Sequence, residues 1–262
     1  MSRIQTGLLA YVLAAVLAWP VHAAELRVSF AELARVVSAV LADAKLHLHN
    51  KPAGFLELGS TGSNLTIAGK QIPLEVKPQS FPLLGSTYAY YINDLNSTSF
   101  RVVPVAGALR LELTFEDKGT DLVGGCIEGG CTFVDALPIV EWSKPKVVIE
   151  LVPVQFAGGL ALNVRKAEIG GTLKPACRSS IGVISASLCS IGLPKARQTI
   201  ANIRGTIDCI VKQKVNQPST QQNFATALKP YLKVGPAGDV AIAQITTDSR
   251  GLVVSFQLAS GQ

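Results

Sequence analysis

The stretch that decides the fold is ALRLELTFE, residues 108–116. Apolar side chains occupy every second position, and polar or charged side chains lie between them. Successive side chains of a β-strand point to opposite faces of a sheet. The alternation therefore predicts an antiparallel strand with one buried face and one face in water. The apolar set is Leu109, Leu111, Leu113 and Phe115, and the polar set is Arg110, Glu112 and Thr114.

The period of two continues on both sides of this strand. It is clear in residues 146–154 and 160–173, and in the first of these Val147, Ile149 and Leu151 share one face. Turn residues (Gly, Pro and Ser) separate shorter strand candidates. These candidates are residues 26–30, 45–50, 55–58, 64–68, 72–76, 239–247 and 251–258, whereas residues 78–97 are less regular. The sequence thus predicts a long antiparallel meander.

Near the N-terminus, the period changes to that of an amphipathic helix. Ser29 is a suitable N-cap, and Glu32 three residues later completes the pattern of a capping box. The apolar stripe of this helix recurs at three- and four-residue steps, which favours packing of one face against a core. Its members are Phe30, Leu33, Val37, Val40, Leu41 and Ala44.

A second, longer helix is expected over residues 195–215, with Pro194 at its N-terminal end, where proline is tolerated. Pro218 breaks or kinks it, and a helix resumes over residues 219–232. The stripe of the long helix comprises Ile200, Ile203, Ile207, Ile210 and Val211. Because there is no internal repeat or low-complexity linker, we expect a single α+β domain over residues 24–262.

Residues 1–23 have the layout of a secretory signal peptide. Arg3 supplies the positive charge, an apolar run extends from Gly7 to Trp19, and small residues surround Ala23. The run is shorter than the ~20 apolar residues of a spanning helix. We therefore expect cleavage near Ala23 and a periplasmic or secreted mature protein.

The composition is apolar for a soluble chain. Hydrophobic residues make up 48% of it and charged residues 16%, below the ~25% typical of soluble domains. Such a chain has either a very large core or a cavity lined by the surplus. Once Arg3 is removed, the 24 basic and 18 acidic residues leave a net charge of +5. This excess favours transient contact with an anionic membrane surface, and without a basic cluster it argues against nucleic acid.

The five cysteines indicate disulfides, because an exported chain reaches an oxidising compartment. Cys126 and Cys131 lie in a glycine-rich loop that can close into a local bridge. Among Cys177, Cys189 and Cys209, one pair and one free thiol are expected, and the sequence does not choose between them. Zinc is the rival interpretation, but it requires further cysteines or histidines close by.

The sequence contains no recognisable catalytic motif, neither G-x-S-x-G nor H-E-x-x-H. His47 and His49 alternate on a strand and therefore share a face, which suits either a metal with a third, distant ligand or a solvated surface. We expect no catalytic residue, no metal and no cofactor.

The order of elements is strand, amphipathic helix, antiparallel meander, cysteine-bearing segment, long helix and terminal strands. This order resembles the tubular lipid-binding superfamily, and in particular the bactericidal/permeability-increasing protein-like domains. The resemblance covers residues 26–258 and also rests on Cys209 within the late helix. It implies a long curved sheet wrapped around the long helix, and a disulfide from Cys209 to Cys177 or Cys189. The loop closed by Cys126 and Cys131 is not part of the family's pattern.

From these features we expect an exported, monomeric binding protein that holds or transfers a lipid or another apolar small molecule in an internal groove. A sheet with one apolar face must cover it, and few helices are available to do so. The alternative from the residues alone is a fully packed core. The expected ligand-binding residues are Leu109, Leu111, Leu113, Val147, Ile149, Leu151, Ile203, Ile207 and Ile210.

A second function is also consistent with the sequence: a structural or assembly protein of the cell envelope that holds a protein partner. An exposed sheet edge is one surface for such a partner. The tyrosines Tyr88, Tyr90 and Tyr91 are another, unless they form ordinary core at a bend.

Overall fold

The structure is a computed structural model. It describes residues 25–51, 62–92, 94–118, 120–131, 136–177, 183–231, 241–248 and 250–257. The signal peptide expected at residues 1–23 and the strand expected at 55–58 lie outside the described residues. The elements are β1 (Glu25–Ser29), α2 (Phe30–Val40), β2 (Lys45–Leu48), β3 (Ser63–Ile67), β4 (Lys70–Leu74), β5 (Gln79–Leu83), β6 (Ser86–Ile92), β7 (Leu95–Val105), β8 (Ala108–Phe115), β9 (Thr120–Glu128), β10 (Ile139–Phe156), β11 (Gly159–Ala176), α3 (Val183–Val215), α4 (Pro218–Leu228), the 3-10 turn η2 (Lys229–Tyr231), β12 (Ala241–Thr247) and β13 (Gly251–Gln257).

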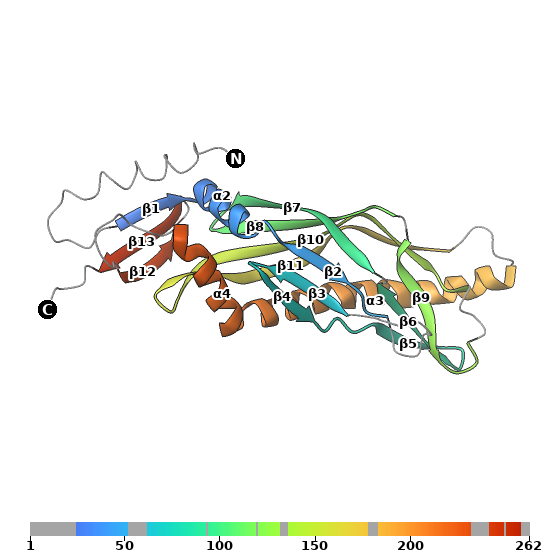
Figure 1. Cartoon of the computed structure of the whole chain (residues 1–262). Coiled ribbons are helices and arrows are strands. Elements are labelled where there is room, and N and C mark those ends of the chain that lie inside the picture. Colours follow the sequence, from blue (N-terminus) through green and yellow to red (C-terminus); the bar gives the residue numbers. More distant parts are fainter. Residues whose placement is uncertain are drawn as a thin grey trace.

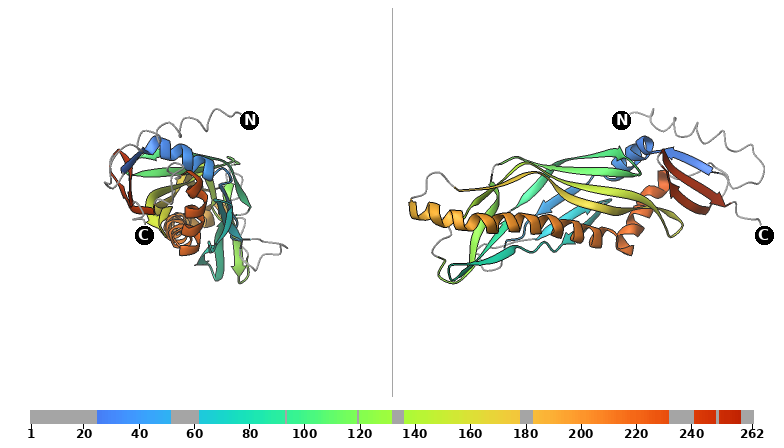
Figure 2. Two further views of the ribbon diagram at one scale, coloured as in Figure 1. Left: turned by 60° about the vertical axis from the view of Figure 1, so that its left-hand side comes forward. Right: turned by 180° about the vertical axis from the view of Figure 1, so that it is seen from behind.

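Most strands belong to one long antiparallel sheet that curls into a half-barrel. Its strand order is β4-β3-β2-β7-β8-β10-β9-β6-β5, and β11 pairs with β10 beside this path. The molecule is elongated, with α3 lying lengthwise along it (Figure 1). Seen along its length, the sheet curves around α3 (Figure 2). The expected α+β fold, a curved antiparallel sheet wrapped around a long helix, is confirmed.

Strands β10 and β11 have 18 residues each and pair with two irregularities of register. Their register shifts between Ser143 and Lys146, where Lys144 has a φ of +50°. Gly171 lies opposite with a φ of +83°, and a Cβ there would be 2.4 Å from the carbonyl oxygen of Lys144. A glycine is therefore required at this bulge, which bends the sheet locally and increases its twist.

The capping box of α2 forms as expected. The backbone N–H of Glu32 donates to Ser29 Oγ over 3.2 Å, and the N–H of Ser29 donates to Glu32 Oε2 over 3.0 Å. Helix α3, in contrast, begins twelve residues before the expected start and continues through Pro194. Tertiary contacts, which local helix propensity does not take into account, stabilise the additional turns. Cys189 is fully buried, and Gly192 lies against Pro138. These contacts offset the ~3 kcal/mol cost of a proline inside a helix.

The region expected to be irregular, residues 78–97, is an ordered part of the sheet. It contains the hairpin of β5 and β6 and the first residues of β7. Leu84 and Gly85 form its turn, both with positive φ. Pro82 lies in β5, an edge strand, where a residue without an N–H is tolerated.

A small second sheet, in the order β1-β13-β12, joins the first described strand to the last two. Asp248 shapes the β12–β13 turn, since its Oδ1 accepts from the N–H groups of Arg250 and Gly251. Arg27 on β1 also pairs with Asp248. At this end of the molecule, α2 and α4 lie beside the small sheet (Figure 1).

Two disulfides are present, Cys126–Cys131 and Cys177–Cys189. The second joins the end of β11 to the first half of α3. The bridge to Cys209 that the family resemblance implied is wrong, because Cys209 is an exposed free thiol. Cys189 lies nearer the N-terminal end of α3 and is buried where the helix passes the end of β11, so it takes the partner instead.

The core is one continuous cluster between the concave face of the sheet and the helices. Trp142 is fully buried in it, packs on Phe115 at 5.8 Å between ring centroids, and donates from Nε1 to the carbonyl oxygen of Gly170 over 2.7 Å. Among the helices that the structure describes, none combines the length and apolar character that a bilayer span requires.

Candidate ligand-binding interior

The six strand residues expected to line the interior form three cross-strand pairs. Strand β10 runs antiparallel to β8, in a register that places the apolar rows of the two strands side by side. All six side chains are at most 1% exposed. The pairs are Leu113 with Val147, Leu111 with Ile149, and Leu109 with Leu151. The structure therefore brings these residues together as one apolar wall.

The opposite wall is the stripe of α3. Ile203 and Ile207 are each 1% exposed and belong to the core cluster. Ile210 is only half-buried and packs at the margin of the cluster, whereas Val211 is 1% exposed. One position turns a helix by about 100°, so the centre of the stripe passes through Val211 rather than Ile210.

An aromatic cluster in β5 and β6 also belongs to this interior, although its residues were not among those expected from the sequence. Phe81 stacks on Tyr88 and on Tyr90, with ring centroids 6.3 and 5.7 Å apart. Tyr88 and Tyr90 are fully buried, and Tyr91 is 6% exposed. The tyrosines are therefore core and not an exposed patch, which removes one of the two surfaces proposed for a protein partner. Burial raises the pKa of Tyr90, whose hydroxyl donates to the carbonyl oxygen of Pro138 over 2.7 Å.

Helix α3 and the segment after it close the edge of β11 with polar side chains. Asn216, directly after α3, accepts from the N–H of Val164 over 2.7 Å and donates to its carbonyl oxygen over 3.1 Å. Asp208 accepts from the N–H of Ala167 over 2.7 Å. These side chains replace a neighbouring strand, because an edge strand otherwise leaves its backbone groups unpaired.

Helix α3 also packs on β5 and β4, the strands at the two ends of the strand order, and its contact with β4 differs from that with β11. Within the described residues, the ion pair at this seam joins Lys214 Nζ to Glu75 Oε1, directly after β4, at 3.6 Å. Glu75 is 77% exposed, and such pairs contribute little to stability. Between the described residues of α3 and β4, the side-chain-to-backbone bonds that join α3 to β11 have no counterpart.

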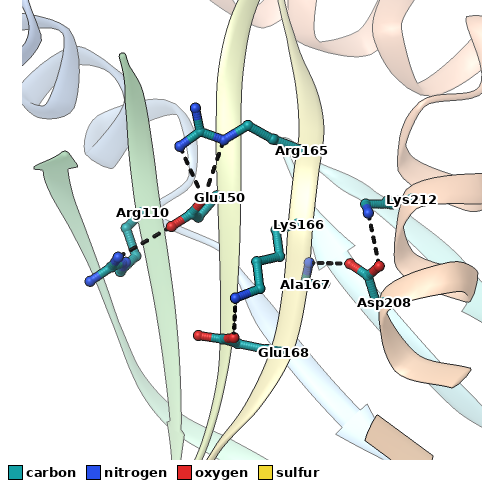
Figure 3. Close-up of polar contacts among 8 residues, drawn as sticks. All are labelled: Arg110, Glu150, Arg165, Lys166, Ala167, Glu168, Asp208 and Lys212. Atoms are coloured by element: carbon teal, nitrogen blue, oxygen red, sulfur yellow. Dashed lines mark hydrogen bonds and ion pairs between the residues drawn. The ribbon is translucent and has the colours of Figure 1, made fainter. Parts of the chain in front are cut away.

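The convex face of the sheet carries charges around Glu150 (Figure 3). A bulge makes Arg165 an extra residue of β11, so that Arg165 and Lys166 are both exposed while Val164 and Ala167 stay buried. Glu150 accepts from Arg110 over 3.2 Å and from Arg165 over 3.1 Å. Burial alone would raise the pKa of Glu150, but the hydrogen bonds and charges of the two arginines outweigh burial and lower it.

A similar balance applies to Asp208 at the helix (Figure 3). Burial would raise its pKa, but Lys212 and the N–H of Ala167 outweigh burial and lower it. Lys166 pairs with Glu168, and this bond raises the pKa of Lys166. These charges lie on the convex face and at the helix edge.

His47 and His49 share a face, as expected, with ring centroids 6.2 Å apart. His47 Nε2 lies 2.9 Å from Asp94 Oδ1, and His49 Nδ1 accepts from the N–H of Asp94 over 3.2 Å. Asn64 donates to His47 Nδ1 over 3.3 Å. These bonds tie β2 to β3 and to the residue before β7. Over the described ranges, no group of three or more His, Cys, Asp or Glu side chains is arranged to hold a metal ion.

Comparison with known proteins gives little sequence similarity. No protein-family model matches the chain, and no curated protein matches it. Among solved structures, the chain is similar to one described as the crystal structure of lipopolysaccharide binding protein, with a TM-score of 0.38 and 10% sequence identity. The match covers 69% of this chain and 42% of that one, so this chain spans less than half of that protein's length.

Proposed function

We propose that this protein binds a lipid or another apolar ligand between the concave face of the sheet and α3, and holds or transfers it without catalysis. The observation that carries the proposal is the apolar interior: the rows of β8 and β10 and the stripe of α3 belong to one buried cluster. The resemblance of the element order to the tubular lipid-binding superfamily leads to the same proposal.

The energetics of such binding need no directed chemistry. Burial of apolar surface contributes about 25 cal/mol per Å², so about 400 Å² of ligand hydrocarbon contributes about 10 kcal/mol. The costs of lost motion and of separating packed walls reduce this value. The remainder is of the order needed for micromolar affinity.

The α3–β4 seam supplies the entry route in this proposal. A ligand that enters there parts the helix from β4 and breaks the ion pair of Lys214 with the exposed carboxylate of Glu75. Entry at the other edge would break the bonds that Asp208 and Asn216 make to β11. Separating α3 from β4 therefore requires less free energy than separating α3 from β11.

We expect the protein to act outside the cytoplasm. The two disulfides are compatible with an oxidising compartment, such as the periplasm or the extracellular space. We expect a monomer there, with its basic excess favouring brief contact with an anionic membrane during transfer.

Native mass spectrometry of protein purified without detergent tests the proposal. We expect an added mass that organic extraction removes and identifies as lipid. Ile207→Trp should reduce lipid uptake severalfold by filling the interior, with the fold unchanged by circular dichroism. Ala201→Trp introduces the same side chain at an exposed position of α3 and should leave uptake unchanged.

An empty protein that takes up nothing from added lipid mixtures would contradict the proposal. That result would instead favour a fully packed core and a role in holding a protein partner, which co-purification would then identify.

A further inference from the structure

Tyr88 in β6 carries a buried hydroxyl that has no partner among the described residues. The residue is fully buried in β6, and within the described structure its hydroxyl makes no hydrogen bond. A buried hydroxyl left unpaired is destabilising, and such groups are rare in folded proteins. A phenylalanine would fill the same space without this penalty, so the hydroxyl at position 88 needs an explanation.

Tyr90, two residues along the same strand, is the matched comparison. It is equally buried and stacks on the same Phe81 ring, but its hydroxyl donates to the carbonyl oxygen of Pro138 over 2.7 Å. The difference between the two tyrosines is therefore the acceptor, not the environment of the rings. Tyr90 has a partner for its hydroxyl, whereas none is present for the Tyr88 hydroxyl in the part of the chain that the structure describes.

We infer that Tyr88 is the polar subsite of the ligand-binding interior and that its hydroxyl donates to the carbonyl oxygen of a neutral acyl ligand, such as an ester. This inference rests on the proposed function. Tyr88 belongs to the core cluster that also contains the apolar rows of β8 and β10, and it stacks on Phe81 of β5, a strand on which α3 packs. Hydrocarbon would then contact the aliphatic walls, and the carbonyl group would satisfy the hydroxyl.

The subsite favours a neutral carbonyl over a carboxylate. A single neutral donor does not offset the loss of solvation of a buried full charge, which costs far more than that of a neutral polar group. A hydrogen bond to an ester carbonyl, by contrast, removes the destabilisation that the unpaired hydroxyl causes in the ligand-free protein. The subsite would thereby distinguish acyl esters from plain hydrocarbon and from free fatty acid.

The test uses an internal ratio. Purified protein is equilibrated with an equal mixture of a long-chain fatty acid methyl ester and an alkane of the same length, and the bound molecules are extracted and quantified by gas chromatography. In Tyr88→Phe we expect the bound ratio of ester to alkane to fall about three- to tenfold, the range for one hydrogen bond. Melting temperature gives the second readout: Tyr88→Phe should melt no lower than the unmodified protein, while Tyr90→Phe should melt lower.

Each contrary outcome has one meaning. An unchanged ratio in Tyr88→Phe, with both molecules bound, overturns the subsite and leaves lipid binding standing. Binding of neither molecule by the unmodified protein overturns the proposed function together with the subsite. A drop in melting temperature equal to that of Tyr90→Phe would mean that the hydroxyl already has a partner. Free fatty acid displacing the ester in a Tyr88-dependent way would overturn the neutral carbonyl.

Discussion

At the scale of single residues, Glu150 organises the charges on the convex face. Its side chain is only 17% exposed and lies between Arg110 and Arg165. A partly buried carboxylate with two charged donors is stabilised more than an exposed ion pair. The lowered pKa of Glu150 records this stabilisation.

We predict that Glu150→Gln lowers the free energy of unfolding by about 1 to 2 kcal/mol at neutral pH. The folded-state pKa lies below the unfolded value of ~4.3, so the contribution is complete above about pH 5. It disappears as the pH falls through the folded pKa, since both states then bind the proton. Urea denaturation of the two proteins from pH 7 to pH 3 measures the difference.

Glu116→Gln is the control for that experiment. Glu116 pairs with Lys118 at 3.0 Å, but its side chain is 61% exposed. The change should stay within about 0.5 kcal/mol. If Glu150→Gln lowered the free energy of unfolding by the same amount at every pH, the carboxylate would act through its shape and not through its charge.

At the scale of elements, the edge of β11 depends on side chains that follow or lie on a helix. We predict that Asn216→Ala destabilises the protein by about 1 to 3 kcal/mol, because the N–H and carbonyl groups of Val164 lose their partner. Hydrogen exchange at the Val164 amide should accelerate, as measured by mass spectrometry of peptides from β11. Asn202→Ala, at an exposed position of α3, should change neither quantity. Unaltered exchange at Val164 in Asn216→Ala would mean that the edge is held by packing alone.

The elements also show how far local sequence determines structure here. The alternation in β8 and the capping box of Ser29 and Glu32 were predicted because both patterns are complete within a few residues. The start of α3 was not, because Pro194 is a strong local signal and the contacts that override it come from distant residues. Similarly, spacing left the partner of Cys177 open, and the thiol that the resemblance selected, Cys209, was the wrong one.

At the scale of the whole molecule, the candidate interior was predictable only in part. The apolar rows of β8 and β10, from Leu109 to Leu113 and from Val147 to Leu151, were predicted because they follow from the two-residue alternation of the sequence. The aromatic cluster lies in a hairpin whose regularity the sequence does not reveal, and the orphan hydroxyl of Tyr88 depends on the positions of neighbours from other strands. The strands that α3 contacts at the edges of the sheet also cannot be predicted from local sequence, because the strand order of the whole sheet determines them.

The unequal edges lead to a prediction about the rate of ligand exchange. Lys214→Glu places two carboxylates across the α3–β4 seam, where Lys214 now pairs with Glu75 at 3.6 Å. Since a surface ion pair with one exposed partner is worth about 1 kcal/mol or less, transfer of a deuterated phospholipid from loaded protein to neutral vesicles should accelerate about two- to fivefold. The acceleration should shrink at high salt, which screens exposed charges.

Reversal of the pair separates the seam from a general effect of charge. The double variant Lys214→Glu with Glu75→Lys restores opposite charges across the seam and should return the transfer rate to that of the unmodified protein. Lys195→Glu makes the same change of net charge at an exposed position of α3 and should not alter the rate. Equal acceleration in Lys195→Glu and Lys214→Glu would mean that the charge change alters the contact between protein and vesicle and not the α3–β4 seam. With no acceleration in either, ligand exchange must bypass the α3–β4 seam, and the stronger contact of α3 with β11 would become the edge to test.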